Sequence, residues 1–101
     1  MATLVLSDIL DDLRVAEEGL HKFERRYWIS STDFYDLYSK GLLDDGENPE
    51  DLAEWAGHYK LRHKRLAALE QISKGRIEAL RRQVGGQTIR LTPVEPVLEL
   101  G

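Results

Sequence analysis

Three histidines, an acidic loop and a pair of serines are the side chains of this sequence best suited to chemistry. His58 and His63 stand five positions apart, about 500° around a helix, so they do not share a face as metal ligands at i and i+4 do. The loop DDGEN at residues 44–48 lacks the alternating oxygen ligands and the closing glutamate of a calcium-binding EF-hand loop. We therefore expect no metal and no cofactor.

The serines give no sign of a catalytic nucleophile. Ser30 and Ser31 are explained as helix-capping residues, and no G-x-S-x-G elbow surrounds them. The chain contains no cysteine, which excludes a thiolate nucleophile, a thiolate metal site and a disulfide framework. Carboxylates are plentiful, but nothing in their spacing marks a paired general acid and base. We expect that the protein is not an enzyme.

Composition and length are those of one small globular domain. The 101 residues are 42% hydrophobic and 32% charged, which does not resemble a disordered chain. The opening MATLVLSDIL lacks the basic start of a signal peptide, and no apolar run reaches the roughly eighteen residues of a membrane span. We expect a cytoplasmic protein that makes no contact with membranes.

The net charge of −4 conceals an uneven distribution. Residues 1–56 hold fourteen acidic and five basic side chains, a net charge of −9, whereas residues 57–101 hold nine basic and four acidic ones, a net charge of +5. We interpret this as two halves that complement each other when the chain folds back on itself. The alternative is a basic arm for nucleic acid, which the overall acidity disfavours.

The apolar pattern predicts a first helix over residues 8–28. Ser7 and the three aspartates that follow it suit a helix N-terminus. Apolar residues then recur at spacings of three and four, typical of a narrow contact with another long helix. They are Ile9, Leu13, Ala16, Leu20, Phe23 and Tyr27. Gly19 inside this helix costs up to ~1 kcal/mol relative to alanine, which a helix of this length tolerates.

Two further helices are expected, over residues 31–40 and 49–84. The stretch YWISSTDFYDLYSKGLL, residues 27–43, holds five of the eight aromatic side chains. Ser30 and Asp33 form a capping-box pattern, and Gly41 suits a left-handed helix end. Asn48 and Pro49 then begin the long helix, which runs to the glycine pair after Val84. The fold class is therefore mainly α: a long antiparallel helical hairpin with a short aromatic bridging helix.

The two long helices differ in length. A helix of about twenty residues spans ~30 Å and one of about thirty-five spans ~52 Å, so about 20 Å of the longer has no internal partner. An apolar stripe left in water forgoes ~25 cal/mol for each Å² that burial would cover. Either Gly75 lets the helix bend back, or a second chain covers the stripe, which is the interpretation we prefer.

The domain is predicted to span residues 1–86, followed by an extended tail over 87–101. Residues 87–91 alternate like a short strand, Pro93 and Pro96 preclude a helix, and residues 2–6 are also β-prone. We thus expect short extended or β segments at both termini, which either pair with each other or dock onto another protein. The predicted partner-binding residues are Ile72, Ile77, Leu80, Val84, Ile89, Leu91, Val94, Val97 and Leu98.

The central stretch, residues 22–61, resembles the signature of a family of small helical prokaryotic proteins of antitoxin type, from toxin–antitoxin modules. The matching positions are Phe23, Glu24, Tyr27, Ser30, Ser31, Phe34, Tyr35, Gly41, Leu43, Asp45, Glu54, Trp55, Ala56 and Tyr59. The signature carries no catalytic residue. Trp28 departs from it, since glycine or another small residue is expected there. The resemblance implies a helical protein that neutralises a toxin by direct binding.

The leading hypothesis is therefore an antitoxin-like protein that binds a cognate toxin through its long C-terminal helix and tail. A homodimer is expected alongside that activity. Two alternatives stay open. One is a homo-oligomeric helical scaffold without a toxin partner; the other is a weak nucleic-acid-binding module that uses the basic run of residues 58–65. Nucleic acid is the least expected partner, because that run is explained by a solvated face opposite the acidic first helix.

Overall fold

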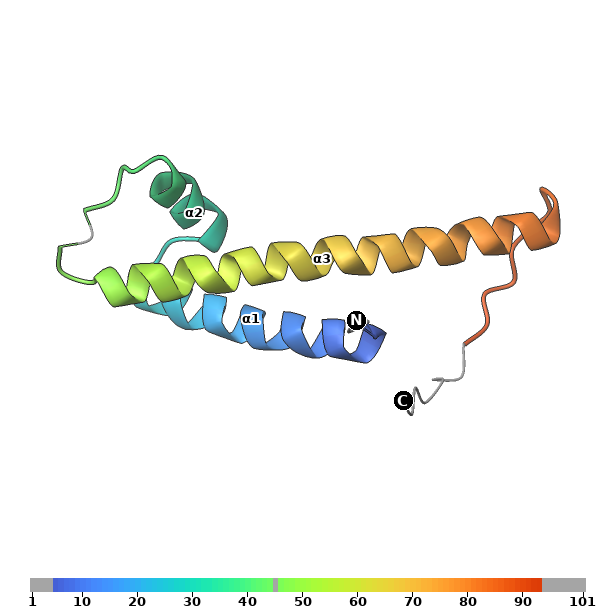
Figure 1. Cartoon of the computed structure of the whole chain (residues 1–101), viewed down its shortest axis with the longest axis horizontal. Helices are drawn as coiled ribbons and strands as arrows, with labels where there is room; N and C mark the ends of the chain where they lie inside the picture. The colour runs from blue at the N-terminus through green and yellow to red at the C-terminus, as the bar shows by residue number, and fades with distance from the viewer. Residues whose placement is uncertain (1–4, 45, 94–101) are drawn as a thin grey trace, which may run out of the picture.

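The computed structural model describes residues 5–44 and 46–93 and contains three helices. Helix α1 spans Leu6–Tyr27, α2 spans Ser31–Ser39 and α3 spans Pro49–Val84. In Figure 1, α1 lies antiparallel to the first half of α3, and α2 lies beside the first turns of α3, on the side opposite α1 in this view. The mainly helical class and the hairpin packing of α1 on α3 are thus confirmed.

The heptad seam of α1 is the face that the fold buries. Five of its six predicted members are buried, and they are Ile9, Leu13, Ala16, Leu20 and Phe23. The sixth, Tyr27, is partly buried and packs against the core. The helix begins at Leu6 rather than after Ser7, and Val5 occupies the N-cap position without a side-chain hydrogen bond. The expectation that Ser7 starts the helix was therefore wrong.

The core gathers around Trp55 of α3, which is 1% exposed. Phe34 of α2 stacks on its indole with ring centroids 3.9 Å apart and an interplanar angle of 1°. Phe23 and Tyr27 of α1 stack on the same indole at 5.6 and 5.5 Å. Because aromatic side chains bury large apolar areas, these rings join all three helices in one small cluster.

The ends of α2 follow from capping. The Ser30 hydroxyl accepts a hydrogen bond from the Asp33 amide, as predicted for the start of this helix. At the other end Gly41 has φ +69°, its amide donates to the Tyr38 carbonyl, and the Leu42 amide donates to the Leu37 carbonyl. This pair of bonds is a Schellman motif, which requires a left-handed residue at the glycine.

Charged side chains hold the hairpin together along its length. Arg65 of α3 reaches Asp12 of α1 at 2.7 Å, and Arg62 of α3 reaches Glu17 at 3.5 Å. In the opposite sense, Lys22 of α1 donates to Glu54 of α3 at 2.8 Å. The first two pairs place acidic side chains of α1 against basic side chains of α3, as the uneven charge distribution predicted, whereas the polarity is reversed near the N-terminus of α3.

Helix α3 continues without a break to Val84. The alternative in which Gly75 bends the helix back is therefore wrong. With 22 residues in α1 and 36 in α3, the long helix exceeds the short one by about 21 Å. Asn48 precedes α3 at the N-cap position, but its side chain makes no capping hydrogen bond, and Pro49 begins the helix.

The segment after α3 carries no strand between residues 87 and 93. In the view of Figure 1 it turns back along the helix, on the side where α1 lies. Residues 87–93 do not form the predicted β pairing between the two terminal segments. Most of its proposed other half, residues 2–4, lies outside the described residues, and Leu6 already belongs to α1.

Candidate functional site

The second half of α3 is the surface that the hairpin leaves uncovered; we call residues 70–84 the overhang. The buried residues of α3 are Leu52, Trp55 and Ala56, all in its first quarter. Ile72 and Ile77 in the overhang are 40% and 37% exposed. Leu80 and Val84 are partly buried. The overhang thus presents branched apolar side chains to solvent on a helix that has no helical partner there.

One side-chain hydrogen bond joins the segment after α3 to the overhang. Arg76 of α3 donates a hydrogen bond from Nη2 to the Thr92 carbonyl at 2.9 Å, which ties this one residue of the segment to the helix. Ile89 is nevertheless 38% exposed and Leu91 74% exposed. Six of the predicted contact residues therefore lie on or beside the overhang. The other three, Val94, Val97 and Leu98, lie outside the described residues.

Sequence reasoning missed the role of Arg76. A basic side chain in the overhang carries no signal that it will bind a backbone carbonyl sixteen residues later. Only the turn at the end of α3 brings the two together: Gly85 and Gly86 have φ +57° and +92°, and the Gln87 amide donates to the Val84 carbonyl. Both glycines adopt the left-handed region that other residues avoid.

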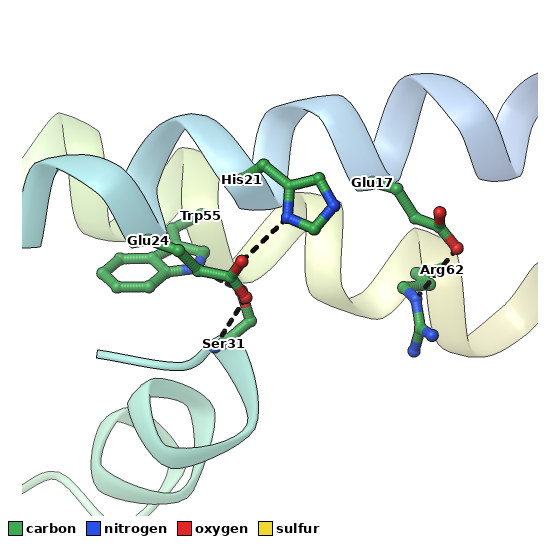
Figure 2. Close-up of polar contacts among 6 residues, drawn as sticks. All are labelled: Glu17, His21, Glu24, Ser31, Trp55 and Arg62. Carbon is green, nitrogen blue, oxygen red and sulfur yellow. Dashed lines mark hydrogen bonds and ion pairs between the residues drawn. The ribbon is translucent and has the colours of Figure 1, made fainter. Parts of the chain in front are cut away.

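A second polar constellation lies at the corner, where α1, α2 and α3 meet. Figure 2 shows Glu24 of α1 between His21 and Ser31. Glu24 Oε1 lies 2.8 Å from His21 Nδ1, while Oε2 accepts from the Ser31 hydroxyl at 2.7 Å and from the Ser31 amide at 3.0 Å. The Ser31 hydroxyl also accepts from the Trp55 indole N–H at 2.9 Å. The buried hydroxyl therefore both donates one hydrogen bond and accepts one.

These residue types occur in catalytic triads, but their order here is different. A triad places the histidine between the nucleophilic serine and the carboxylate, so that the imidazole takes the serine proton. In this protein the carboxylate of Glu24 stands between Ser31 and His21, and Ser31 is only 4% exposed. The arrangement therefore fixes the corner and leaves no activated nucleophile at Ser31.

Ser31 had been explained as a helix cap, and that explanation was wrong. Ser30 alone caps α2, whereas Ser31 joins α1 to α3 through Glu24 and Trp55. Partial burial by itself would raise the pKa of Glu24, but the hydrogen bonds from His21 and Ser31 outweigh it, and the pKa lies below its ordinary value of 4.5. The carboxylate is thus held in its charged, accepting form.

The histidines do not combine into a metal site. His58 lies against Gly19, where an added Cβ would sit 2.5 Å from the imidazole, and its Nε2 is 3.4 Å from Glu54. His63 stacks on Tyr59 with centroids 5.7 Å apart. Within residues 5–44 and 46–93, no group of three or more histidine, aspartate or glutamate side chains is arranged to hold a metal ion.

No protein-family model, curated protein or solved structure matches this chain. None of the three described helices is both long enough and apolar enough to cross a membrane.

Proposed function

We propose that this protein is an antitoxin-like binding protein that neutralises a cognate toxin of the cytoplasm by direct contact through the overhang and the tail. The observation that carries this proposal is the apolar stripe of the overhang, to which Leu80 and Val84 also belong. Ile72 and Ile77, five positions apart, lie at its two edges and are 40% and 37% exposed. Burying such side chains stabilises a complex by ~25 cal/mol for each Å² removed from water. A helix that projects apolar side chains beyond its own core is suited to a hydrophobic groove on another protein.

The corner supports the same proposal indirectly. A bridging helix that packs Phe34 on Trp55, together with the Glu24–Ser31–Trp55 hydrogen bonds, fixes α1 against the first half of α3. The overhang then projects as a continuation of a rigid hairpin. A preorganised helix loses less conformational freedom on binding than a flexible one, so more of the contact energy becomes affinity.

The charges of the overhang indicate the kind of surface it contacts. Residues 70–84 contain four basic and two acidic side chains, a net charge of +2. An apolar groove with an acidic rim on the toxin would complement this pattern. Pairing of two overhangs would bring like net charges together, which favours the toxin over a second copy as the occupant. The homodimer expected from the sequence would then form through a face other than the overhang.

Co-expression with the product of the adjacent gene tests the proposal. We expect the double variant Ile72→Asp with Ile77→Asp to lose co-purification, because two carboxylates would enter the apolar contact. A matched control is Leu10→Asp with Val15→Asp, two aliphatic residues of α1 that are 47% and 50% exposed. Retention of the complex by the overhang variant, or equal loss in both variants, would contradict the proposal.

Light scattering on the isolated protein separates the homo-oligomeric scaffold from the antitoxin-like protein. A scaffold whose overhangs pair with each other forms a dimer at micromolar concentration, and the Ile72→Asp with Ile77→Asp variant converts it to a monomer. An antitoxin-like protein whose overhang awaits a toxin shows no such change in mass. The control variant in α1 keeps the wild-type mass in either case.

A further inference from the structure

The basic run of residues 58–65 divides between two sides of α3. Arg62 and Arg65 face α1, where they pair with Glu17 and Asp12. Of the basic side chains in this run, only these two arginines form ion pairs with carboxylates of α1 among the described residues. Lys60 and Lys64 are exposed, and no carboxylate of the described residues lies within ion-pair distance of either ammonium group.

The two lysines flank an open groove between α2 and α3, which we call the tyrosine groove. It has a volume of about 550 Å³ and is lined by Tyr35, Tyr59, Lys60, His63, Lys64 and Ala67. Its wall is aromatic: Tyr35 stacks on Tyr59 with ring centroids 4.6 Å apart, and Tyr59 stacks on His63 at 5.7 Å. His63 is exposed, so this row of rings has one end in solvent.

The cationic surface continues beyond the groove. Positions 60, 64, 67, 71, 74, 78 and 81 share one face of a helix because they recur at intervals of three and four residues, and position 82, four after 78, lies on the same face. On this face Lys74, Arg81 and Arg82 follow the two lysines, and Glu78 is the single acidic residue. From Lys64 to Arg82 the track is about 27 Å long at the helical rise. It faces away from the acidic side chains of α1.

We propose that the tyrosine groove binds single-stranded nucleic acid, with a base stacked at the exposed end of the aromatic row and the backbone phosphates along Lys60 and Lys64. Single strands are bound without sequence preference by this combination of aromatic faces and a positively charged track. An acidic peptide would use the ammonium groups but would leave the ring faces without a matching partner. The nucleic acid uses both features of the groove.

This site is separate from the apolar stripe of the overhang. Ile72 and Ile77 are rotated by about 80–140° around the helix from Lys60 and Lys64, and they lie at least eight residues farther along it, about 12 Å at the helical rise. The two proposals therefore stand or fall independently. A variant that abolishes binding of nucleic acid is expected to co-purify with the toxin as the wild type does.

Fluorescence anisotropy with labelled oligo-U and oligo-dT of about twelve nucleotides, measured from 50 to 200 mM salt, tests the site. Replacing Lys60→Gln and Lys64→Gln together removes two phosphate contacts. The slope of log K against log salt should fall by about 1.4, and the affinity at 50 mM salt by about fiftyfold. Arg14→Gln with Arg25→Gln removes the same charge from α1 and should change the binding only slightly. His63→Ala should weaken binding about tenfold, the contribution of one base–aromatic stack.

Three results would overturn the proposal. The first is no change in anisotropy with wild-type protein at tens of micromolar in 50 mM salt. The second is an equal loss in the lysine and arginine pairs, which would show a response to net charge alone. The third is displacement of the oligonucleotide by poly-glutamate as effectively as by unlabelled oligonucleotide, since the ring faces would then contribute nothing. Circular dichroism of each variant establishes that its helices remain folded.

Discussion

Replacing Ser31 with alanine removes a hydroxyl on which two helices depend. The Trp55 indole N–H, buried with its ring, loses its acceptor, and Glu24 loses the shorter of its two bonds to Ser31. A buried donor without a partner costs ~1–3 kcal/mol, and a hydrogen bond to a charged group contributes ~1.5–3 kcal/mol. The Ser31 amide still donates to Glu24, and alanine gains ~0.5 kcal/mol in helix propensity. We expect a net loss of about 2–4 kcal/mol.

Urea unfolding followed by circular dichroism measures this loss, and thermal unfolding should show the melting temperature falling by roughly 10–20 °C. Ser39→Ala is the matched control, because that exposed hydroxyl donates only to the Asp36 carbonyl of its own helix. It should cost no more than ~0.5 kcal/mol. Trp55→Phe should cost less in the Ser31→Ala background than in the wild type, with a coupling of roughly 1–3 kcal/mol. A Ser31→Ala cost equal to that of Ser39→Ala would refute the reasoning.

Three further predictions follow from contacts of the hairpin. Gly19→Ala should lower the free energy of unfolding by ~1–2 kcal/mol because the new Cβ meets the His58 ring. In a His58→Ala background the same substitution should raise the free energy of unfolding by up to ~1 kcal/mol, since only the gain in helix propensity remains. Urea titration of the wild type, both single variants and the double variant shows whether the effect of Gly19→Ala changes sign. Trp28→Gly should stabilise by up to ~1 kcal/mol, since Trp28 is left-handed at φ 62° and 89% exposed; a lower urea midpoint would contradict this. Because the folded-state pKa of Glu24 lies below 4.5, its contribution is complete above about that pH and is lost as the pH falls through the folded value. Between pH 6 and pH 3 the free energy of unfolding should therefore fall less steeply with pH for Glu24→Gln than for the wild type.

The conformation of Trp28 also explains why the sequence seemed unusual at that position. The residue is the C-cap of α1 in the left-handed region, and its amide donates to the Glu24 carbonyl. Glycine adopts this conformation without strain, whereas a tryptophan has a Cβ that crowds the backbone. Backbone geometry alone therefore favours glycine at this position.

The sequence by itself determined the helices and the buried face of the first. Spacings of three and four from Ile9 to Phe23 define a stripe on any helix, whatever it packs against, and that stripe is buried here. Local devices also sufficed at Ser30 and Gly41, because capping depends on neighbours within about one turn. The surplus length of α3 followed from counting residues between its start and its end.

Only the tertiary structure decided which polar groups meet across the helices. Ser31 and Trp55 are 24 residues apart, and Arg65 and Asp12 are 53 apart, distances at which sequence spacing carries no geometric information. For the same reason, the sequence alone did not show that two arginines of the basic run, Arg62 and Arg65, face α1, whereas two lysines, Lys60 and Lys64, line the tyrosine groove. That division depends on the rotation of α3 about its axis, which is set by the packing of Trp55 between Phe23, Tyr27 and Phe34.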